Sequence, residues 1–338
     1  VGWGAGTSTR GRLCRPTPIA GARPAKAVAR RIQVANRTRQ ANHAVMPAPV
    51  NHAMPGSDVA DHPANVTAPL HLAPSRNTGA ALLYRAGQAW LVVAIAGQLL
   101  MAGYVAWFYG GAALQGQPER WNKTLQQGYV PGEPMLNAVL ASHLFLVMVI
   151  VIGGALQLLP SLRRSYAGLH RWIGRGYLAT ASVLSLSGLY LIWVGGGTPG
   201  DVPQKLGTSF NGLLILVFAT MAWRAARRRQ TAFHRRWALR LFIAVSGVWF
   251  FRLALTLWLA VHQAPVGFDP ETFTGPTLSI LTFAQFLVPL AVLELYFRAQ
   301  ASPASRLWQP TSVVLVAATL LTAAGITTAS MMLWLPRF

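Results

Sequence analysis

The chain has 338 residues, of which 53% are hydrophobic and only 11% are charged, and its formal net charge is +21. A soluble domain usually has about a quarter of its residues charged, and one this poor in charge would expose large apolar patches and associate. The composition therefore excludes an ordinary soluble protein and predicts a chain that lipid surrounds.

The N-terminal segment differs from the rest. Residues 1–80 are rich in Ala, Pro, Arg and polar residues and lack sustained apolar periodicity, so they bury too little surface to offset the entropy of ordering. We expect a disordered basic tail there and a helical membrane region over 81–338. Few aromatic side chains lie among its arginines, so we expect no nucleic-acid binding. Because Met46 and Met54 precede the first apolar run, we interpret the first 45 to 53 residues as a non-native start.

Apolar segments follow one another from residue 87 onwards. Each has about 20 residues or close to it, enough for a helix to cross a ~30 Å hydrocarbon core at 1.5 Å per residue. Helices satisfy their own backbone hydrogen bonds in lipid, and the alternation of barrel strands is absent. The sequence therefore predicts an all-α, polytopic bundle of about seven transmembrane helices. The expected spans are 87–110, 135–160, 171–194, 207–224, 241–262, 276–298 and 310–334.

Positive charges divide unevenly between the two sets of connections. The richer set is expected on the cytoplasmic side and holds Arg163, Arg164, Arg171, Arg175, Arg224, Arg227, Arg228, Arg229, Arg235, Arg236, Arg240, Arg298 and Arg306. The poorer set holds Arg120, Lys123, Lys205 and Arg337. We therefore expect a bacterial inner-membrane protein whose N-terminus is cytoplasmic and whose C-terminus is external.

Polar residues inside the predicted spans are the first candidates for a site. Arg252 lies ~15 Å from the outer end of its span, where an uncompensated charge costs at least ~2.5–3.5 kcal/mol. His143 and Gln285 lie at similar depths, and Gln157 shares a helix face with His143. We interpret these four as an outward-facing polar pocket in which Arg252 binds an anionic or carbonyl group and His143 donates or shuttles a proton. The alternative is a structural network in which Arg252 bonds to helix carbonyls and Gln285.

Two of the basic connections resemble each other. The two stretches are Arg163-Arg164 followed by His170-Arg171-Trp172, and Arg228-Arg229 followed by His234-Arg235-Arg236-Trp237. Either the helix pairs around them are parallel repeats, or both are basic, aromatic loops that contact anionic lipid. We expect a cytoplasmic-interface cluster of His170, Arg171, His234 and Arg240. Glu294 is expected to meet Arg240 or Arg298 there rather than Arg252.

Haem is the alternative to a protein without a cofactor. Cys14 is the only cysteine, so histidines would be the ligands. His143 and His262 fall in the predicted outer half, and His170 and His234 in the inner half. A transmembrane di-haem cytochrome needs two such pairs, although His143 and His262 differ in expected depth by ~10 Å.

The motifs resemble a bacterial family of predicted multi-pass membrane proteins, domain of unknown function 2306. The likeness covers about residues 135–255 and rests on His143, Gly154-x-x-Gln157, Arg163-Arg164, His170-Arg171-Trp172-Ile173-Gly174-Arg175-Gly176-Tyr177, His234-Arg235-Arg236-Trp237-Ala238-Leu239-Arg240 and Arg252. The resemblance implies a helical membrane fold. It implies no reaction.

The expected function is binding or transport rather than soluble enzyme chemistry. The sequence has no Walker loop, dinucleotide fingerprint, HExxH or GxSxG motif. The leading interpretation is a protein that binds or transports a small molecule or ion in its polar pocket, with membrane lipids as its other partners. The alternatives are a b-type cytochrome-like electron-transfer protein and a structural or accessory membrane subunit.

Overall fold

A computed structural model describes residues 78–125, 128–194, 200–301 and 306–337. Within these ranges the regular elements are helices, apart from one isolated β-bridge between Asp269 and Thr274. The all-α prediction is therefore confirmed. The predicted tail lies outside the described residues except for 78–80, which already belong to the first helix.

Within the described ranges, six helices are long and apolar enough to cross a membrane, and a bent helix pair makes a seventh span if it is counted as one. The six begin with α2 (Thr78–Val105, continued by the π-helix η1, Ala106–Gly110, and by α3, Gly111–Leu114), α4 (Pro134–Leu158), α6 (Ala167–Trp193) and α7 (Val202–Arg227). They end with α10 (Pro276–Ala301) and α11 (Trp308–Ala329, continued by η3, Ser330–Trp334). The bent pair is α8 (Thr231–Val245) and α9 (Gly247–His262). The short helices are η2 (Pro118–Lys123), α5 (Pro160–Ser165) and η4 (Leu335–Arg337).

The fifth predicted span, 241–262, is not one straight helix. Its chain bends by 47° between α8 and α9, at Ser246 and Gly247, and the Ser246 hydroxyl donates a hydrogen bond to the Phe242 carbonyl at 2.7 Å. Ser and Gly together are a common cause of sharp helix kinks. The residues directly before and after the break, 241–245 and 247–251, are apolar, so hydropathy does not show it, and the expectation of one continuous helix over 241–262 was wrong.

The basic helix ends also extend further than predicted. The first helix begins at Thr78 rather than 87, and α6 begins at Ala167, so that His170 and Arg171 are helical. Hydropathy marks only the part of a helix that lies in hydrocarbon. Long basic side chains allow a helix to continue beyond it, because their charged heads reach water.

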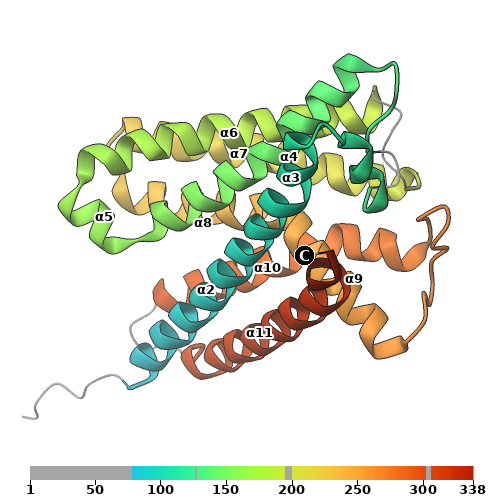
Figure 1. The fold of residues 1–338 in the computed structure, drawn as a ribbon. Helices are drawn as coiled ribbons and strands as arrows, with labels where there is room; N and C mark the ends of the chain where they lie inside the picture. Colours follow the sequence, from blue (N-terminus) through green and yellow to red (C-terminus); the bar gives the residue numbers. More distant parts are fainter. Residues whose placement is uncertain (1–77, 126–127, 195–199, 302–305, 338) are drawn as a thin grey trace, which may run out of the picture. The chain divides into compact units, whose positions relative to one another are not determined.

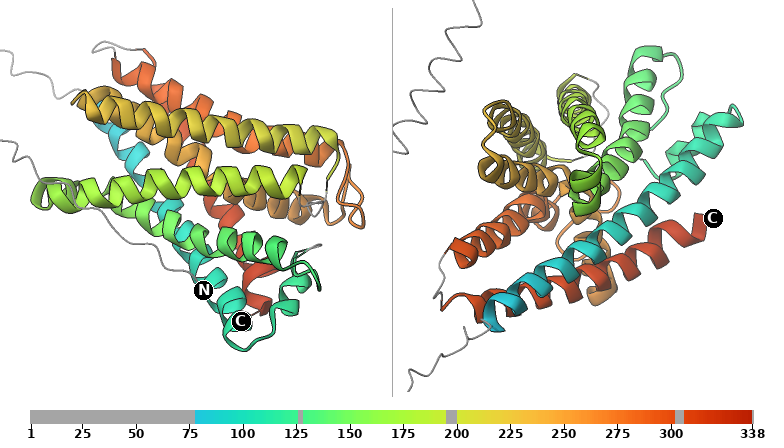
Figure 2. Two further views of the ribbon diagram at one scale, coloured as in Figure 1. Left: turned by 90° about the horizontal axis from the view of Figure 1, so that it is seen from above. Right: turned by 90° about the vertical axis from the view of Figure 1, so that its left-hand side faces the viewer.

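Packing follows the chain order in one half of the described region and departs from it in the other. The helix α4 packs on α6, α6 on α7 and α7 on α8, with α5 turning between α4 and α6 (Figure 1). In contrast, α2 and α11 lie alongside each other although they are far apart in sequence (Figure 2). The break lets α8 pack against α7 while α9 packs against α10 and α11.

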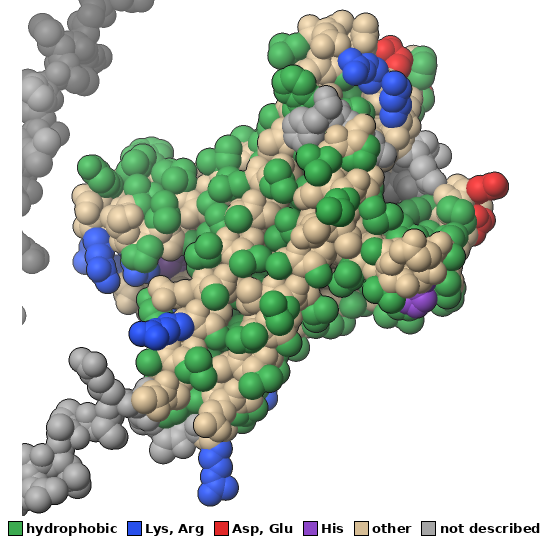
Figure 3. Space-filling view, turned by 60° about the horizontal axis from the view of Figure 1, so that its bottom comes forward, with side chains coloured by type: hydrophobic (Ala, Val, Ile, Leu, Met, Phe, Trp, Pro, Cys, Tyr) green, Lys and Arg blue, Asp and Glu red, His purple; other side chains and the backbone are tan. Residues whose placement is uncertain are grey.

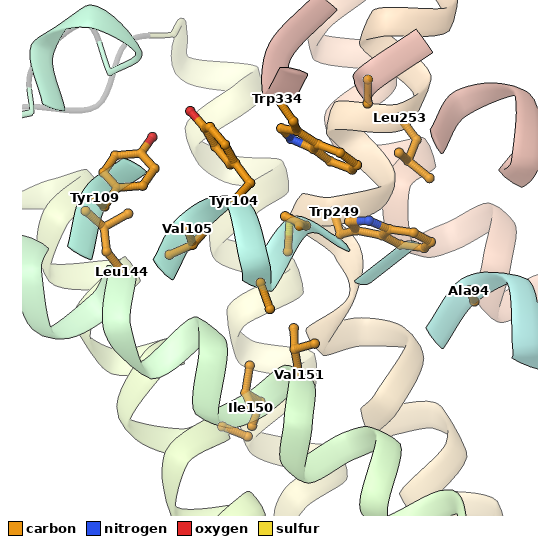
Figure 4. Close-up of a cluster of buried hydrophobic side chains, with 14 of the residues drawn as sticks. Ala94, Tyr104, Val105, Tyr109, Leu144, Ile150, Val151, Trp249, Leu253 and Trp334 are labelled. Atoms are coloured by element: carbon orange, nitrogen blue, oxygen red, sulfur yellow. The ribbon is translucent and has the colours of Figure 1, made fainter. Parts of the chain in front are cut away.

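Buried apolar side chains gather where α2, α4, α9 and η3 meet. Figure 4 shows Tyr104, Leu144, Trp249, Leu253 and Trp334 pointing into this cluster. Large apolar side chains also remain exposed along the outer helix faces, among them Val92, Val183, Leu213, Ile280 and Leu320. In water these surfaces would associate, whereas lipid tails solvate them.

Charged side chains lie towards the helix ends. On the face drawn in Figure 3, apolar side chains cover the surface between basic side chains at the left and bottom and a group of basic and acidic side chains at the top, with further acidic side chains at the right. We call the end formed by α5, the starts of α6 and α8 and the last turns of α7 and α10 the basic end. The side of the membrane that it faces stays a prediction.

Candidate functional site

Arg252 is the sixth residue of α9, a little more than one turn after the break. Its side chain is half-buried. Among the described residues, its guanidinium makes one hydrogen bond, from Nη1 to the Sδ atom of Met101 on α2 at 3.8 Å. A thioether sulfur is a weak acceptor, and no carboxylate of the described chain lies within salt-bridge distance of Arg252. The positive charge thus has no counter-charge among the residues that the structure describes.

His143 on α4 is anchored to α6. Its Nδ1 lies 2.9 Å from the Ser187 Oγ atom, and the Ser187 hydroxyl also lies 3.1 Å from the Leu184 carbonyl oxygen, to which it donates. A hydroxyl has one proton, so Ser187 accepts from His143 while it donates to Leu184. This arrangement puts the imidazole proton on Nδ1. Nε2 then has no hydrogen-bond partner in the described part of the chain.

His143 and Arg252 are close enough to interact electrostatically, although no hydrogen bond joins them. Two of the four residues of the predicted polar pocket therefore lie within electrostatic range of each other, while the imidazole contacts Ser187 and the guanidinium contacts Met101.

The other two predicted pocket residues lie elsewhere. Gln157 donates a hydrogen bond from Nε2 to the His170 carbonyl at 2.9 Å, which ties the end of α4 to the start of α6. Gln157 follows His143 by about 21 Å along the helix axis, so sharing a face did not place the two side chains at one depth. Gln285 donates to the Thr282 carbonyl on its own helix at 2.8 Å. The alternative network between Arg252 and Gln285 is therefore not formed in the structure.

Arg240, on the other half of the bent helix pair, is a paired cation. Its Nε lies 2.6 Å from the Oε1 atom of Glu294, and its guanidinium lies 4.6 Å from the Trp237 ring centroid and 5.3 Å from that of Phe297. Cation–π contacts of this kind stabilise a partly desolvated arginine. The expectation that Glu294 meets Arg240 rather than Arg252 is confirmed.

The two repeated motifs occupy equivalent places. His170 is the fourth residue of α6, and His234 is the fourth residue of α8. The two histidines are close enough to interact electrostatically. The Nδ1 of His234 lies 3.0 Å from the Ala222 carbonyl oxygen, to which it donates, whereas the buried Nδ1 of His170 has no partner among the described residues. Arg171 on the next position is exposed.

The outer histidines of the haem alternative have separate partners. His262 is exposed at the end of α9, where its ring stacks on Trp258 at 3.9 Å and its Nδ1 lies 3.0 Å from the Trp258 carbonyl oxygen. His143 is instead bonded to Ser187. No group of three or more His, Cys, Asp or Glu that could hold a metal ion occurs in the described ranges. Haem binding stays a prediction.

Sequence reasoning missed the residues that the site uses from other helices. Met101 and Ser187 carry no signal in the sequence, because a methionine or serine in an apolar helix is common and only packing shows its partner. The cluster of Gln98, Asn211, Ser246 and Gln285 around the break was also missed. The adjacent Ser246 and Gly247 in the middle of an apolar run were the available signal.

The comparisons with known proteins agree with this architecture. Residues 140–297 match the family described as "Predicted membrane protein (DUF2306)". The matched stretch holds all the site residues named above that lie on α4, α6, α8, α9 and α10. No curated protein and no solved structure matches the chain. The resemblance that the motifs indicated is thus confirmed, and residues 140–297 of this multi-pass helical membrane protein are similar to that family of predicted membrane proteins.

Proposed function

We propose that this membrane protein binds or transports a small molecule that has an anionic group, and that Arg252 and His143 contact it. The observation that carries the proposal is the guanidinium of Arg252, which is half-buried within an apolar span and whose one hydrogen-bond acceptor in the described part of the chain is a sulfur atom. An uncompensated charge at such depth costs several kcal/mol in order-of-magnitude terms and usually marks a functional site.

The chemistry of the guanidinium favours a carboxylate or phosphate as the missing partner. Arginine presents five N–H donors in a planar fork that matches these groups in a bidentate way. Only one donor of Arg252 has an acceptor among the described residues, and that acceptor is weak. A bound anion would fill the remaining donors and neutralise the charge at the same time.

His143 supplies a second contact. Its Nδ1 is occupied by Ser187, so the ring is held in place and Nε2 remains to bind the ligand. An imidazole can gain or lose a proton near neutral pH. His143 would therefore allow proton transfer to accompany binding, which Arg252 alone cannot do because it stays charged.

Ligand-induced stabilisation of the purified full chain in detergent tests the proposal. Acetate, benzoate and inorganic phosphate are titrated against the wild type and Arg252→Met, a change that removes the charge but keeps an unbranched side chain. At least one anion is expected to raise the melting temperature of the wild type, with a response at least about tenfold weaker in Arg252→Met.

Arg175→Met is the matched control. Arg175 is exposed at the basic end, with its guanidinium 4.8 Å from the Trp172 ring centroid. This variant should keep the full response to the anion. Equal responses of the wild type and Arg252→Met to every anion would reject Arg252 as the binding group.

A b-type cytochrome is the second candidate, and one observation favours it. The Nδ1–H of His234 is held by the Ala222 carbonyl, as is usual for an imidazole whose other nitrogen ligates a metal. An absorbance spectrum of the purified protein tests this function. A Soret band that disappears in His234→Ala would support it, and a colourless preparation from haem-supplemented cells would reject it.

A further inference from the structure

We propose that the starts of α6 and α8, together with α5, form a surface that binds the headgroups of anionic phospholipids in the surrounding bilayer. This surface belongs to the basic end. It lies far from His143, because Gln157 follows His143 by about 21 Å along α4 and bonds to the His170 carbonyl at the start of α6. The inference therefore does not depend on the function proposed for Arg252 and His143.

Positive charge far exceeds negative charge at the basic end. Glu294 is the one carboxylate that the described residues place there, and Arg240 is paired with it at 2.6 Å. No other arginine of the described basic end lies within salt-bridge distance of a carboxylate. A basic cluster of this size beside membrane-spanning helices attracts anionic lipid. The arginines concerned are all exposed, and they are Arg163, Arg164, Arg171, Arg175, Arg224, Arg227, Arg228, Arg229, Arg235, Arg236 and Arg298.

Three elements bring part of this charge together around the histidines of the repeated motifs. His234 of α8 and Arg163 of α5 are both close enough to His170 of α6 to interact with it electrostatically. Arg171 is the next residue of α6. The side chains of Arg163 and Arg171 make no hydrogen bond or ion pair with another described residue. The donors of both guanidinium groups therefore remain available to a phosphate, which arginine binds in a bidentate way.

The starts of the two helices add to the positive potential. The N-cap residues, Tyr166 of α6 and Gln230 of α8, make no capping hydrogen bond with their side chains, and neither first turn contains an acidic residue. The amino end of a helix carries a partial positive charge and unsatisfied N–H groups. Both helix starts therefore favour an anion beside them, in addition to the arginines.

Exposed aromatic side chains among these arginines favour a lipid over a soluble anion. Trp172 is 69% exposed and Phe233 is 58% exposed, and the guanidinium of Arg175 lies 4.8 Å from the centroid of the Trp172 ring. Figure 3 shows basic side chains directly beside apolar ones at the left. Aromatic side chains of this kind lie at the level of the headgroups in a bilayer. A phospholipid can contact the arginines with its phosphate and the rings with its apolar part, whereas a soluble phosphate leaves the rings exposed.

The charge balance selects the class of headgroup. Choline and ethanolamine headgroups carry an ammonium group that cancels the charge of the phosphate, so these lipids bring no net negative charge to the surface. Phosphatidylglycerol keeps the negative charge of its phosphate. An anionic headgroup of this type therefore balances the excess of arginine, and a zwitterionic one does not.

The test measures the melting temperature of the full chain in mixed micelles while phosphatidylglycerol replaces phosphatidylcholine at constant total lipid. A saturable rise in the melting temperature is expected for the wild type. In the double variant Arg163→Gln/Arg171→Gln, the phosphatidylglycerol fraction that gives half of the rise should increase at least about tenfold. Identical melting temperatures in the two lipids would overturn the proposal.

Matched variants separate this surface from the effect of net charge. Arg120→Gln/Lys123→Gln removes the same charge from exposed residues of η2, which precedes α4 and packs against its first half. This variant should keep the full response to phosphatidylglycerol. An equal loss of response in the two Gln double variants would reject the surface.

Two further measurements identify the occupant. Arg163→Lys/Arg171→Lys keeps both charges and should retain most of the lipid response, and a loss as complete as that of the Gln variant would contradict an electrostatic contact. Soluble glycerol phosphate is added at the same concentration as the lipid and should give no rise that depends on Arg163 and Arg171. A rise that the Gln variant at these positions abolishes would show that free phosphate is the occupant and would reject the lipid.

Discussion

Arg240 and Arg252 both lie on the bent helix pair, but the surroundings of their guanidinium groups differ. Arg240 on α8 has a carboxylate at 2.6 Å and two aromatic rings around its guanidinium. Arg252 on α9 has one contact to sulfur among the described residues. The contacts of Arg240 balance its positive charge, whereas the described contact of Arg252 does not balance its charge. We therefore assign ligand binding to the region of Arg252 and a structural role to that of Arg240.

The largest expected effect is that of Arg252→Met, which should stabilise the protein, although most substitutions destabilise. Arg252→Met removes a charge for which the described residues supply no counter-charge, so the free energy of unfolding without ligand should rise by ~2 kcal/mol. Denaturation in mixed micelles, followed by circular dichroism, measures it. A destabilisation of similar size would show that Arg252 is a structural residue and would remove the contrast with Arg240.

Arg240→Met should have the opposite sign. It leaves Glu294 without its partner in a partly buried place and removes two cation–π contacts. Because the Glu294 side chain is 41% exposed, solvent screens part of the loss, and we expect a destabilisation of roughly 1–2 kcal/mol. The same unfolding measurement checks it.

The double variant with Glu294→Gln sharpens this result. Since the unpaired carboxylate is then also gone, the double variant should be more stable than the sum of the two single changes predicts. Strict additivity would mean that the ion pair contributes nothing.

Ser187→Ala should have a smaller effect, close to 1 kcal/mol. It removes the hydrogen bond that holds His143 and leaves Nδ1 without its partner, and a lost side-chain bond of this kind has about that magnitude. Nuclear magnetic resonance of the ¹⁵N-labelled imidazole should show a mixture of tautomers in place of one. An unchanged tautomer would mean that Ser187 does not orient the ring.

The features that depend on composition and on depth along a helix were predicted from the sequence. The apolar runs predicted the spans, and the expected depth of Glu294 correctly favoured Arg240 over Arg252. Periodicity failed for Gln157, because it gives the face of a helix and not the neighbour at that depth.

The break at Ser246 and the contact between Arg252 and Met101 depend on how distant helices pack. Neither feature changes the hydropathy of the chain, so neither could be predicted from the hydropathy pattern. Asn211 and Gln285 could be recognised as intramembrane polar residues, but only the structure shows that both reach Gly247.

Arg175→Met should have the smallest effect and sets the baseline for the two larger arginine changes. Arg175 is exposed, and its guanidinium lies over Trp172 at 4.8 Å. An exposed cation–π contact contributes about 0.5–1 kcal/mol. The unfolding free energy should fall by no more than that, and the anion response should not change. A loss as large as that of Arg240→Met would mean that any arginine of this half of the molecule matters equally. The contrast between Arg240 and Arg252 would then reflect general charge and not their particular partners.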